Sequence, residues 1–225
     1  MLTHHRTPRW TSGAVAALLL AAAVPAHAQV SWTDWTESGT NSVSGTMLFG
    51  TVPVGVTYSG SYAFAQTACG TDYWVPNVYT GSGVPNAPTN CEIVALSQAG
   101  LKTITFSRAV TNPLLALVSW NGQPSVTFNG PLELVATGRG FWGAGTMAVS
   151  GNDLLMSGEA HGTIRLLGTY TSITFTDRSE NWHGFQVGAT SLGPQTTIPE
   201  PSTYALTGAG LLGLLAATRR RQRAA

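Results

Sequence analysis

The residues best suited to chemistry lie in two short stretches of the sequence, GEAHG and SENWHG. Glu159 and His161 are two positions apart, so on a β-strand their side chains point to the same face. If a neighbouring strand carries His183, then Glu180 and His183 converge with this first pair. Two histidines with carboxylates are adequate for a metal ion or for acid–base chemistry. A structural role is the stronger interpretation, because each histidine precedes a glycine at an expected strand start, where an imidazole commonly hydrogen-bonds a turn.

No established catalytic motif accompanies these residues. The sequence contains no Gly-x-Ser-x-Gly elbow, no His-Glu-x-x-His pair and no Walker loop. Its carboxylates are scattered, so no glycosidase pair stands out, and the run GNDLLMSGE lacks the Asp-x-Asp core of a calcium loop. We therefore expect no catalytic residue, no metal ion and no other cofactor. A secreted glycan-active hydrolase, whose carboxylates converge only in the fold, is the alternative.

Aromatic side chains are the second kind of candidate, because exposed tryptophan and tyrosine rings form flat platforms on which sugar rings stack. Tyr73, Trp74 and Tyr79 lie in one stretch rich in Gly, Pro, Asn and Ser, and loops at the end of a β-sandwich commonly display binding residues. A glycan-binding surface at these three residues is therefore one hypothesis. The stronger interpretation is that Trp74 packs over the core, since tryptophan is buried on average. The other prominent aromatic residues are Trp32, Trp35, Trp120, Phe141, Trp142 and Trp182.

The elements that must position these residues are short strands. Hydrophobic and polar residues alternate in many segments, for example at Ile104 and Phe106 in LKTITFSR and at Ile173 and Phe175 in TSITFTD. The continuous apolar run PLLALVSW predicts a central strand buried on both faces. Turn signals separate these segments, and only CEIVALSQAG is a candidate for a short helix. The pattern predicts an all-β fold, a single antiparallel β-sandwich that is jelly-roll-like, over residues 29–190.

Charge is scarce in this sequence. Charged residues make up 9% of the 225 residues, against a usual share of about a quarter. Six of the eleven cations lie in the two terminal segments, so residues 29–198 carry five cations, nine carboxylates and a net charge of −4. A mildly acidic body with one lysine offers no phosphate-binding stripe, and we expect no nucleic-acid partner.

The N-terminal segment predicts export. It has a positive region with two arginines, an apolar run at Ala14–Val24 and a small-residue cleavage site, Ala26-His27-Ala28. These are the parts of a secretory signal peptide, and the apolar run is too short for an uncleaved membrane anchor. We therefore assign residues 1–28 to a signal peptide.

The C-terminal segment predicts a stop at the membrane. After a linker at 191–198 and a Pro-Glu-Pro stretch, residues 204–218 form an uncharged run that predicts a single hydrophobic helix. This run is shorter than the ~20 residues of a relaxed membrane span. A basic tail at 219–223 follows, with Arg219, Arg220, Arg221 and Arg223. Arginines beside a hydrophobic segment stay in the cytoplasm, so we expect the body on the opposite side.

The order of these C-terminal parts resembles a PEP-CTERM sorting signal over residues 199–225. The resemblance rests on the motif Pro199-Glu200-Pro201-Ser202, the helix with its small residues and the terminal arginine cluster. It implies a protein of Gram-negative bacteria that make exopolysaccharide, recognised by exosortase, a membrane-embedded enzyme that is thought to cut near the Pro-Glu-Pro motif. Roughly residues 90–190 also resemble the β-rich ectodomain of many PEP-CTERM proteins, and that likeness implies no activity.

The two cysteines, Cys69 and Cys91, flank the loop that holds the three candidate platform residues. In an exported protein, an even pair with no companion ligands favours a disulfide. Closing such a loop stabilises the fold by about 3 kcal/mol in the chain-entropy model. A metal site or a reactive thiol is the alternative interpretation.

Together these features predict a non-catalytic exported surface or matrix protein, associated with exopolysaccharide or biofilm. The expected partners are exosortase, an extracellular polysaccharide, and the membrane, which the C-terminal helix contacts before processing. We expect an inner-membrane-anchored precursor with its body in the periplasm, followed by a location at the cell surface or in the extracellular matrix.

Overall fold

A computed structural model describes residues 29–89, 91–121, 124–194 and 206–212 of the protein. The predicted signal peptide at 1–28, the Pro-Glu-Pro motif at 199–201 and the basic tail lie outside these residues. Within the predicted hydrophobic helix, residues 206–212 are described and are helical. The strands are β1 Ser31–Trp32, β2 Asp34–Gly39, β3 Ser42–Phe49, β4 Val52–Ser59, β5 Phe64–Gln66, β6 Ile93–Leu96, β7 Gly100–Thr111, β8 Leu114–Trp120, β9 Ser125–Thr127, β10 Leu132–Thr137, β11 Thr146–Ser150, β12 Asp153–Ser157, β13 Ala160–Leu166, β14 Thr169–Asp177, β15 His183–Ala189 and β16 Ser191–Leu192.

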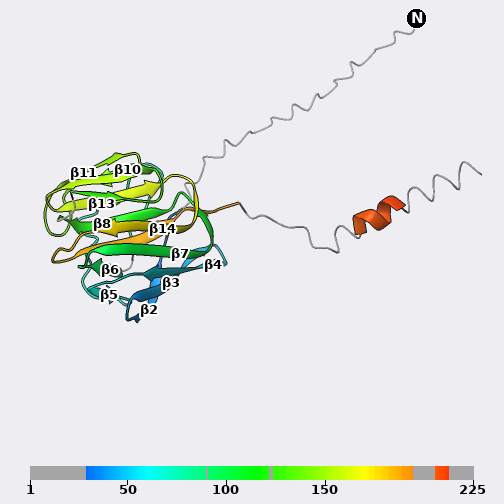
Figure 1. The fold of residues 1–225 in the computed structure, drawn as a ribbon, viewed down its shortest axis with the longest axis horizontal. Coiled ribbons are helices and arrows are strands. Elements are labelled where there is room, and N and C mark those ends of the chain that lie inside the picture. The colour runs from blue at the N-terminus through cyan, green and yellow to red at the C-terminus, as the bar shows by residue number, and fades with distance from the viewer. Residues whose placement is uncertain (1–28, 90, 122–123, 195–205, 213–225) are drawn as a thin grey trace, which may run out of the picture.

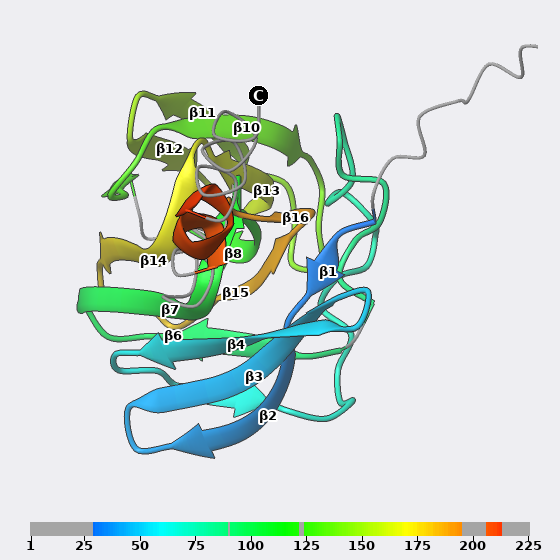
Figure 2. The ribbon, with the colours of Figure 1, turned by 90° about the vertical axis from the view of Figure 1, so that its right-hand side faces the viewer.

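These strands form an antiparallel β-sandwich (Figure 1), which confirms the predicted all-β fold. Sheet A has the order β10-β13-β8-β15-β6-β5, and β1 also pairs with β15. Sheet B has the order β14-β7-β4-β3-β2, and β16 also pairs with β7. A small sheet of β11, β12 and β9 lies at the opposite side of the sandwich from β2 and β3 (Figure 2).

Strand β4 shows how alternation forms these sheets. Val54, Val56 and Tyr58 are buried, while the residues between them face outward. Successive side chains of a strand point to opposite faces, so one face of β4 packs against the core and the other meets solvent. The chain returns from β3 to β4 through a two-residue turn in which Gly50 has a φ of 62°, a left-handed value that glycine adopts at low cost.

The main core lies between sheets A and B. Three large aromatic side chains meet in it: Phe185 contacts Trp35 with ring centroids 6.4 Å apart and Tyr58 with centroids 5.6 Å apart. Aliphatic residues from both sheets fill the space around them. The other face of sheet A points away from this core, and a separate segment of the chain covers it.

The loop between β5 and β6 covers that outer face and forms a third layer. Trp74 and Tyr79 are 2% and 0% exposed and belong to a second core with Leu114, Ala116 and Val118 of β8. Strand β8 is therefore buried on both faces, as the run PLLALVSW predicts. The same covering explains the complete burial of β6 and β15.

A disulfide between Cys69 and Cys91 closes this covering loop, as predicted, with the two Cα atoms 4.7 Å apart. Both ends of the loop are thereby tied together beside β5 and β6. The third layer is consequently held to sheet A by a covalent bond as well as by its buried aromatic residues.

Replacing both cysteines by serine is expected to lower the free energy of unfolding of the processed protein by about 3 kcal/mol, because the unfolded chain regains the freedom of the open loop. Urea denaturation of the variant and the wild type measures the difference. Thiol titration of the unfolded, unreduced wild-type protein should find no free thiol. Two free thiols, or equal urea midpoints, would contradict the pairing or its contribution.

Two expectations about segment boundaries need correction. The stretch CEIVALSQAG contains strand β6 and not a helix, because its residues are buried on both faces and periodicity cannot separate a buried strand from a helix. The predicted linker at 191–198 begins with strand β16, which pairs with Val110 and Thr111 of β7. The N–H of Gly193 also donates to the carbonyl of Ala109 at 2.8 Å, so the sandwich continues past residue 190.

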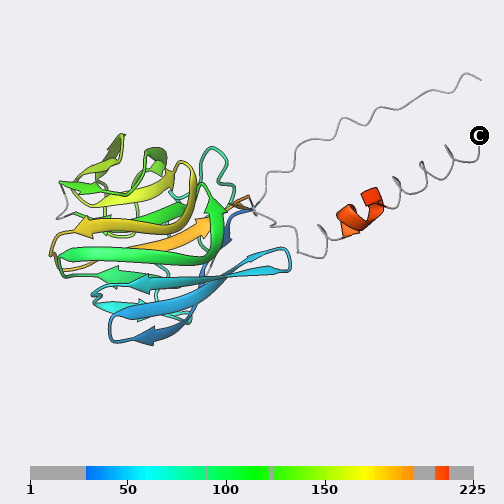
Figure 3. The ribbon, with the colours of Figure 1, turned by 45° about the vertical axis from the view of Figure 1, so that its right-hand side comes forward.

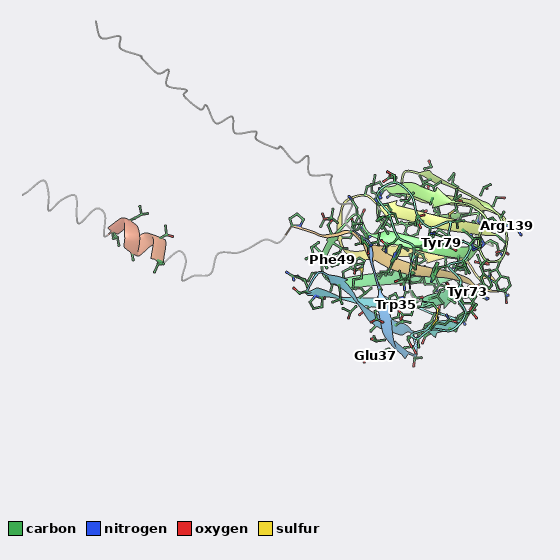
Figure 4. The ribbon with its side chains drawn as sticks, turned by 180° about the vertical axis from the view of Figure 1, so that it is seen from behind. Trp35, Glu37, Phe49, Tyr73, Tyr79 and Arg139 are labelled. Atoms are coloured by element: carbon green, nitrogen blue, oxygen red, sulfur yellow. A yellow bond between two sulfur atoms is a disulfide. The ribbon has the colours of Figure 1, made fainter. Side chains whose placement is uncertain are left out.

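Both ends of the described body lie at one side of the sandwich (Figure 3). Gln29, Phe49 and Thr190 line the same surface depression there. Figure 4 shows Phe49 at this side, whereas Tyr73 and Arg139 lie at the opposite side. Gln29 and Thr190, near the two ends of the described body, therefore lie at the side away from Tyr73.

Candidate functional site

The four residues predicted to converge form two groups with different partners. Glu159 and His161 interact with the end of β8, whereas Glu180 and His183 belong to a buried charge cluster with Asp177. Across the described residues, no group of three or more histidine, cysteine and carboxylate side chains is arranged to hold a metal ion. His161 therefore lies near Glu159, and His183 contacts Asp177 and Glu180, but the two histidines do not belong to one site.

The buried charge cluster links the two sheets. Asp177 at the end of β14 lies 3.4 Å from Nζ of Lys102 in β7 and 3.2 Å from Nε2 of His183 at the start of β15. Nδ1 of His183 contacts the carboxylate of Glu180. Lys102 also donates to the hydroxyl of Ser61 and to the carbonyl of Gln98, both at 2.7 Å. The side chains of Lys102, Asp177 and His183 are 0% exposed, so solvent does not screen these contacts.

The protonation of His183 follows from its surroundings. Burial alone would lower the pKa of this histidine, but its hydrogen bonds and ion pairs with Asp177 and Glu180 outweigh burial and raise the pKa. His161 shows the opposite balance, because burial lowers its pKa more than the charge of Glu159 raises it. The pKa values of the two histidines are therefore shifted in opposite directions, and the neutral form is favoured for His161.

Stability is expected to fall as the pH rises above about 6.5, the ordinary pKa of an unfolded histidine. Because the folded pKa of His183 is raised, its contribution is complete below about 6.5 and is lost as the pH passes through the folded value. His161 has a lowered pKa, so its contribution is lost only on acidification. Urea midpoints above about pH 6.5 should drop for the wild type and stay flatter for His183→Gln. Equal slopes for the two proteins would contradict this role of His183.

Glu159 is oriented by the end of strand β8. The hydroxyl of Ser119 donates to Oε2 of Glu159 at 2.6 Å, and the side-chain amide of Asn121 donates to Oε1. The Ser119 N–H donates to Nδ1 of His161 at 3.2 Å. Since the Ser119 hydroxyl donates to the carboxylate and not to the imidazole, these side chains do not form the serine–histidine pair of nucleophilic catalysis.

A bulge in β8 produces this arrangement. Trp120 pairs with Ala160 and Leu117 with Gly162, so β8 holds one residue more than β13 over the same span. Ser119 lies in the bulge with a φ of 60°, a left-handed conformation that is costly for a residue with a side chain. Bulges commonly redirect side chains beside functional sites, and strain of this kind clusters there.

The loop GRGFWGAG between β10 and β11 lies directly over this bulge. A side chain at Gly140 would come within 2.3 Å of the His161 ring, and one at Gly145 within 2.5 Å of the Glu159 backbone. Both glycines are therefore needed for the loop to approach β13 so closely. The Gly140 N–H donates to the Gly143 carbonyl at 2.9 Å, and this tight turn carries Phe141 and Trp142.

Five aromatic side chains meet beside this turn and form what we call the aromatic cluster: Phe64, Tyr73, Phe141, Trp142 and Trp182. Their rings touch mostly edge to face, with Tyr73 centroids 5.1 Å from Phe141 and 5.2 Å from Trp182. Trp142 lies 4.9 Å from Phe141 and 6.3 Å from Trp182. Trp142 is 54% exposed and Phe141 is 36% exposed, so the cluster presents apolar surface to solvent.

The predicted platform of Tyr73, Trp74 and Tyr79 needs correction. Trp74 and Tyr79 are buried against sheet A and cannot present a ring face to a sugar, which agrees with the stronger interpretation that Trp74 packs over the core. Only Tyr73 takes part in the half-exposed aromatic cluster. Burial also raises the pKa of Tyr79, so its hydroxyl stays protonated over the ordinary pH range.

A pocket of about 260 Å³ lies between the aromatic cluster and Glu159. We call it the indole pocket, and its lining residues are Ser119, Asn121, Trp142, Glu159, Asn181 and Trp182. These residues come from the ends of β8, β13 and β15, which are adjacent strands of sheet A, and from the GRGFWGAG loop. The pocket thus combines two indole rings with one carboxylate, two amides and a hydroxyl. Such a mixture of aromatic walls and few polar groups is typical of small-ligand sites.

Two larger depressions on the surface lack this combination. One of about 500 Å³ lies between β9 and β14, and its aromatic residues, Phe128 and Phe175, are each only 2% exposed. The other, of about 440 Å³, lies beside Gln29 at the side where the chain ends leave the body. Neither offers an exposed indole face, so the indole pocket is the better candidate despite its smaller volume.

A family model for the PEP-CTERM protein-sorting motif matches residues 197–221. The chain carries a PEP-CTERM sorting signal. This match confirms the signal predicted over residues 199–225 and shows an exported protein that is sorted by exosortase. Comparison with curated proteins and with solved structures finds no match. In the part of the chain that the structure describes, no helix is long and apolar enough to span a membrane.

In this PEP-CTERM protein, the indole pocket and Thr190 lie at opposite ends of strand β15. His183 begins β15 beside the pocket residue Trp182, and Ala189 ends it where it pairs with Ser31. Seven residues of strand separate these ends, which corresponds to roughly 20 Å. The pocket is therefore on the side of the body away from Thr190, where Figure 4 shows Tyr73 and Arg139.

Proposed function

We propose that this PEP-CTERM protein is a non-catalytic glycan-binding protein of the cell surface or the exopolysaccharide matrix. The observation that carries the proposal is the indole pocket, in which two indole rings face one carboxylate and three uncharged polar side chains. The sorting motif supports the proposal because it indicates an exported body, and we infer that its ligand there is extracellular polysaccharide.

The indole rings supply the apolar part of sugar recognition. Trp142 is 54% exposed, the plane of its ring is inclined at 78° to that of Trp182, and both side chains line the pocket. The face of a sugar ring that carries its C–H groups can pack on either indole, and such burial of aromatic surface is a main source of binding energy. The surrounding aromatic cluster keeps the rings in place, which limits the entropy that binding must remove.

The polar side chains of the pocket can orient a bound sugar through hydrogen bonds. Ser119, Asn121 and Asn181 provide hydroxyl and amide groups that donate and accept hydrogen bonds, and Glu159 provides acceptors. Sugar hydroxyls need both kinds of partner. Because Ser119 and Asn121 already hold the Glu159 carboxylate, this group is pre-oriented toward the pocket.

The composition of the pocket supports binding over hydrolysis. A typical glycosidase needs two carboxyl groups, about 5 Å or about 6.5–9.5 Å apart. Among the described residues that line the indole pocket, Glu159 is the sole carboxylate. His161, the nearest candidate for acid–base chemistry, is buried and neutral and donates no proton to the Ser119 hydroxyl.

Replacing Trp142 by alanine is expected to weaken binding to the host's own purified exopolysaccharide at least tenfold, or by about 1.4 kcal/mol. Tryptophan fluorescence of the processed protein, titrated with the polysaccharide, measures this change. Leu48→Ala is the matched control, because Leu48 is 60% exposed at the far side of the body and its loss should leave affinity unchanged. Unchanged binding by Trp142→Ala would contradict the site, and release of new reducing ends would contradict a non-catalytic role.

A further inference from the structure

Glu159 is the charged member of the indole pocket, and its charge is not neutralised by its neighbours. Its two contacts come from a hydroxyl and an amide, which are uncharged donors. Lys102, Arg165 and His183 form ion pairs with other carboxylates, those of Asp177, Glu133 and Glu180. The adjacent His161 is buried and is held neutral. The pocket therefore has a net negative charge that a ligand can neutralise.

The two indole rings add to this preference. A ring face attracts a cation that lies within about 6 Å of its centre, and tryptophan is the strongest of the aromatic residues in this respect. The ring centroids of Trp142 and Trp182 lie 6.3 Å apart, their planes are inclined at 78°, and both side chains line the indole pocket. Glu159 lines the same pocket. Two indole faces and a carboxylate together favour an ammonium group.

The size of the pocket restricts what can carry that ammonium group. A volume of about 260 Å³ is below the usual range of about 300–1,000 Å³ for small-molecule sites. It suits a single sugar unit better than a long stretch of polymer. An acyl group on the amine would add volume and remove the positive charge, and a uronic acid would place a second carboxylate beside Glu159.

We propose that the indole pocket selects a sugar unit with a free ammonium group, such as a de-N-acetylated hexosamine, over N-acetylated, neutral and uronic-acid units. The inference rests on the proposed glycan-binding function and narrows its ligand class. The ammonium group lies between the Glu159 carboxylate and the indole rings, and the sugar hydroxyls meet the side chains of Asn121 and Asn181.

Binding of four sets of short oligosaccharides to the processed protein tests this selection. The probes are oligomers of glucosamine, N-acetylglucosamine, glucose and glucuronic acid, measured by calorimetry at a mildly acidic pH at which the amine is protonated. We expect the glucosamine oligomer to bind about 10–100-fold more tightly than the N-acetylated one, as for a charge-assisted hydrogen bond. Glu159→Gln should abolish this preference, because the glutamine side chain has a similar shape but carries no negative charge.

Because the body has a net charge of −4, a cationic oligomer can also bind without specificity. Glu37→Gln is the matched control, since Glu37 lies exposed on the edge strand β2, away from the pocket, and the substitution removes the same charge. It should leave the preference intact. An equal loss in both variants would overturn the proposal.

The remaining outcomes separate this proposal from the proposed function. Equal or tighter binding of the neutral or N-acetylated oligomers would overturn the selection but leave glycan binding in place. Binding of choline with no binding of any sugar would overturn the sugar as the carrier of the cation. No binding of any of the four oligomers, together with no binding of the host polysaccharide, would overturn the proposed function itself.

Discussion

Replacing Lys102 by methionine is expected to lower the free energy of unfolding by about 3–5 kcal/mol, because it removes the ammonium partner of a buried carboxylate and leaves only the imidazole of His183 beside it. Lys102 and Asp177 are both 0% exposed, and their 3.4 Å contact joins two strands of sheet B directly above His183 of sheet A. For a protein of this size the thermal midpoint falls by about 2–4 °C per kcal/mol. Thermal unfolding of the processed protein measures the effect.

The Arg165–Glu133 pair provides the control for this prediction. Its side chains are 16% and 41% exposed, so Arg165→Met should cost far less, within about 1 kcal/mol. The double variant Lys102→Met with Asp177→Asn should recover part of the loss, since it removes one charge of each sign and leaves His183 paired with Glu180. A loss below about 1 kcal/mol for Lys102→Met would show that the buried cluster does not stabilise the fold.

Replacing Glu200 by alanine is expected to abolish exosortase processing and to leave a longer, membrane-retained precursor. Glu200 is the central residue of the Pro-Glu-Pro motif within the matched segment 197–221. Immunoblots of membrane and released fractions from an exosortase-positive host, with an exosortase-deficient strain for reference, report the outcome. Thr196→Ala, just outside the matched segment, should be processed like the wild type. Normal processing of Glu200→Ala would contradict the role of the motif.

The alternation of hydrophobic and polar residues correctly predicted the sandwich. The same alternation places two charged residues, Lys102 and Asp177, at inner positions of their strands. Ile104 and Phe106 were placed on the inner face of their strand, and the position two residues earlier on that face is Lys102. Ile173 and Phe175 lead in the same way to Asp177. A charged residue at an inner position of each of two strands indicates a buried pair, because an unpaired buried charge is too costly to be kept.

The site residues were harder to predict, because the burial of an aromatic residue in a loop depends on whether that loop folds over an apolar face of a sheet. Trp74 and Tyr79 have the polar, turn-rich neighbours of an exposed loop, yet the loop folds over the apolar outer face of sheet A and buries them. Trp142 lies in a similar loop and stays exposed, because the approach of Gly140 and Gly145 to β13 holds its turn at the edge of the sheet. Sequence alone does not tell these two loops apart.

Glu159 illustrates a prediction that was half right. Its separation of two residues from His161 correctly indicated a shared neighbourhood, and both interact with Ser119. The contacts of Glu159 with Ser119 and Asn121 could not be predicted. They depend on a bulge between β8 and β13, and no local sequence pattern indicates this bulge. The convergence of Asn121, Asn181 and Trp182 on the same pocket follows from the adjacency of β13, β8 and β15, which is a long-range property of the fold.

The indole N–H signals of the processed protein test the proposed glycan site most directly. Without the signal peptide the chain retains six tryptophans: Trp32, Trp35, Trp74, Trp120, Trp142 and Trp182. In a nitrogen-15-labelled sample titrated with the glucosamine oligomer or the host polysaccharide, we predict that the Trp142 and Trp182 signals shift together in a saturable way. The signals of the buried Trp35, Trp74 and Trp120 should stay in place. Saturable binding that leaves Trp142 and Trp182 unshifted, or no shift with any glycan, would contradict the account.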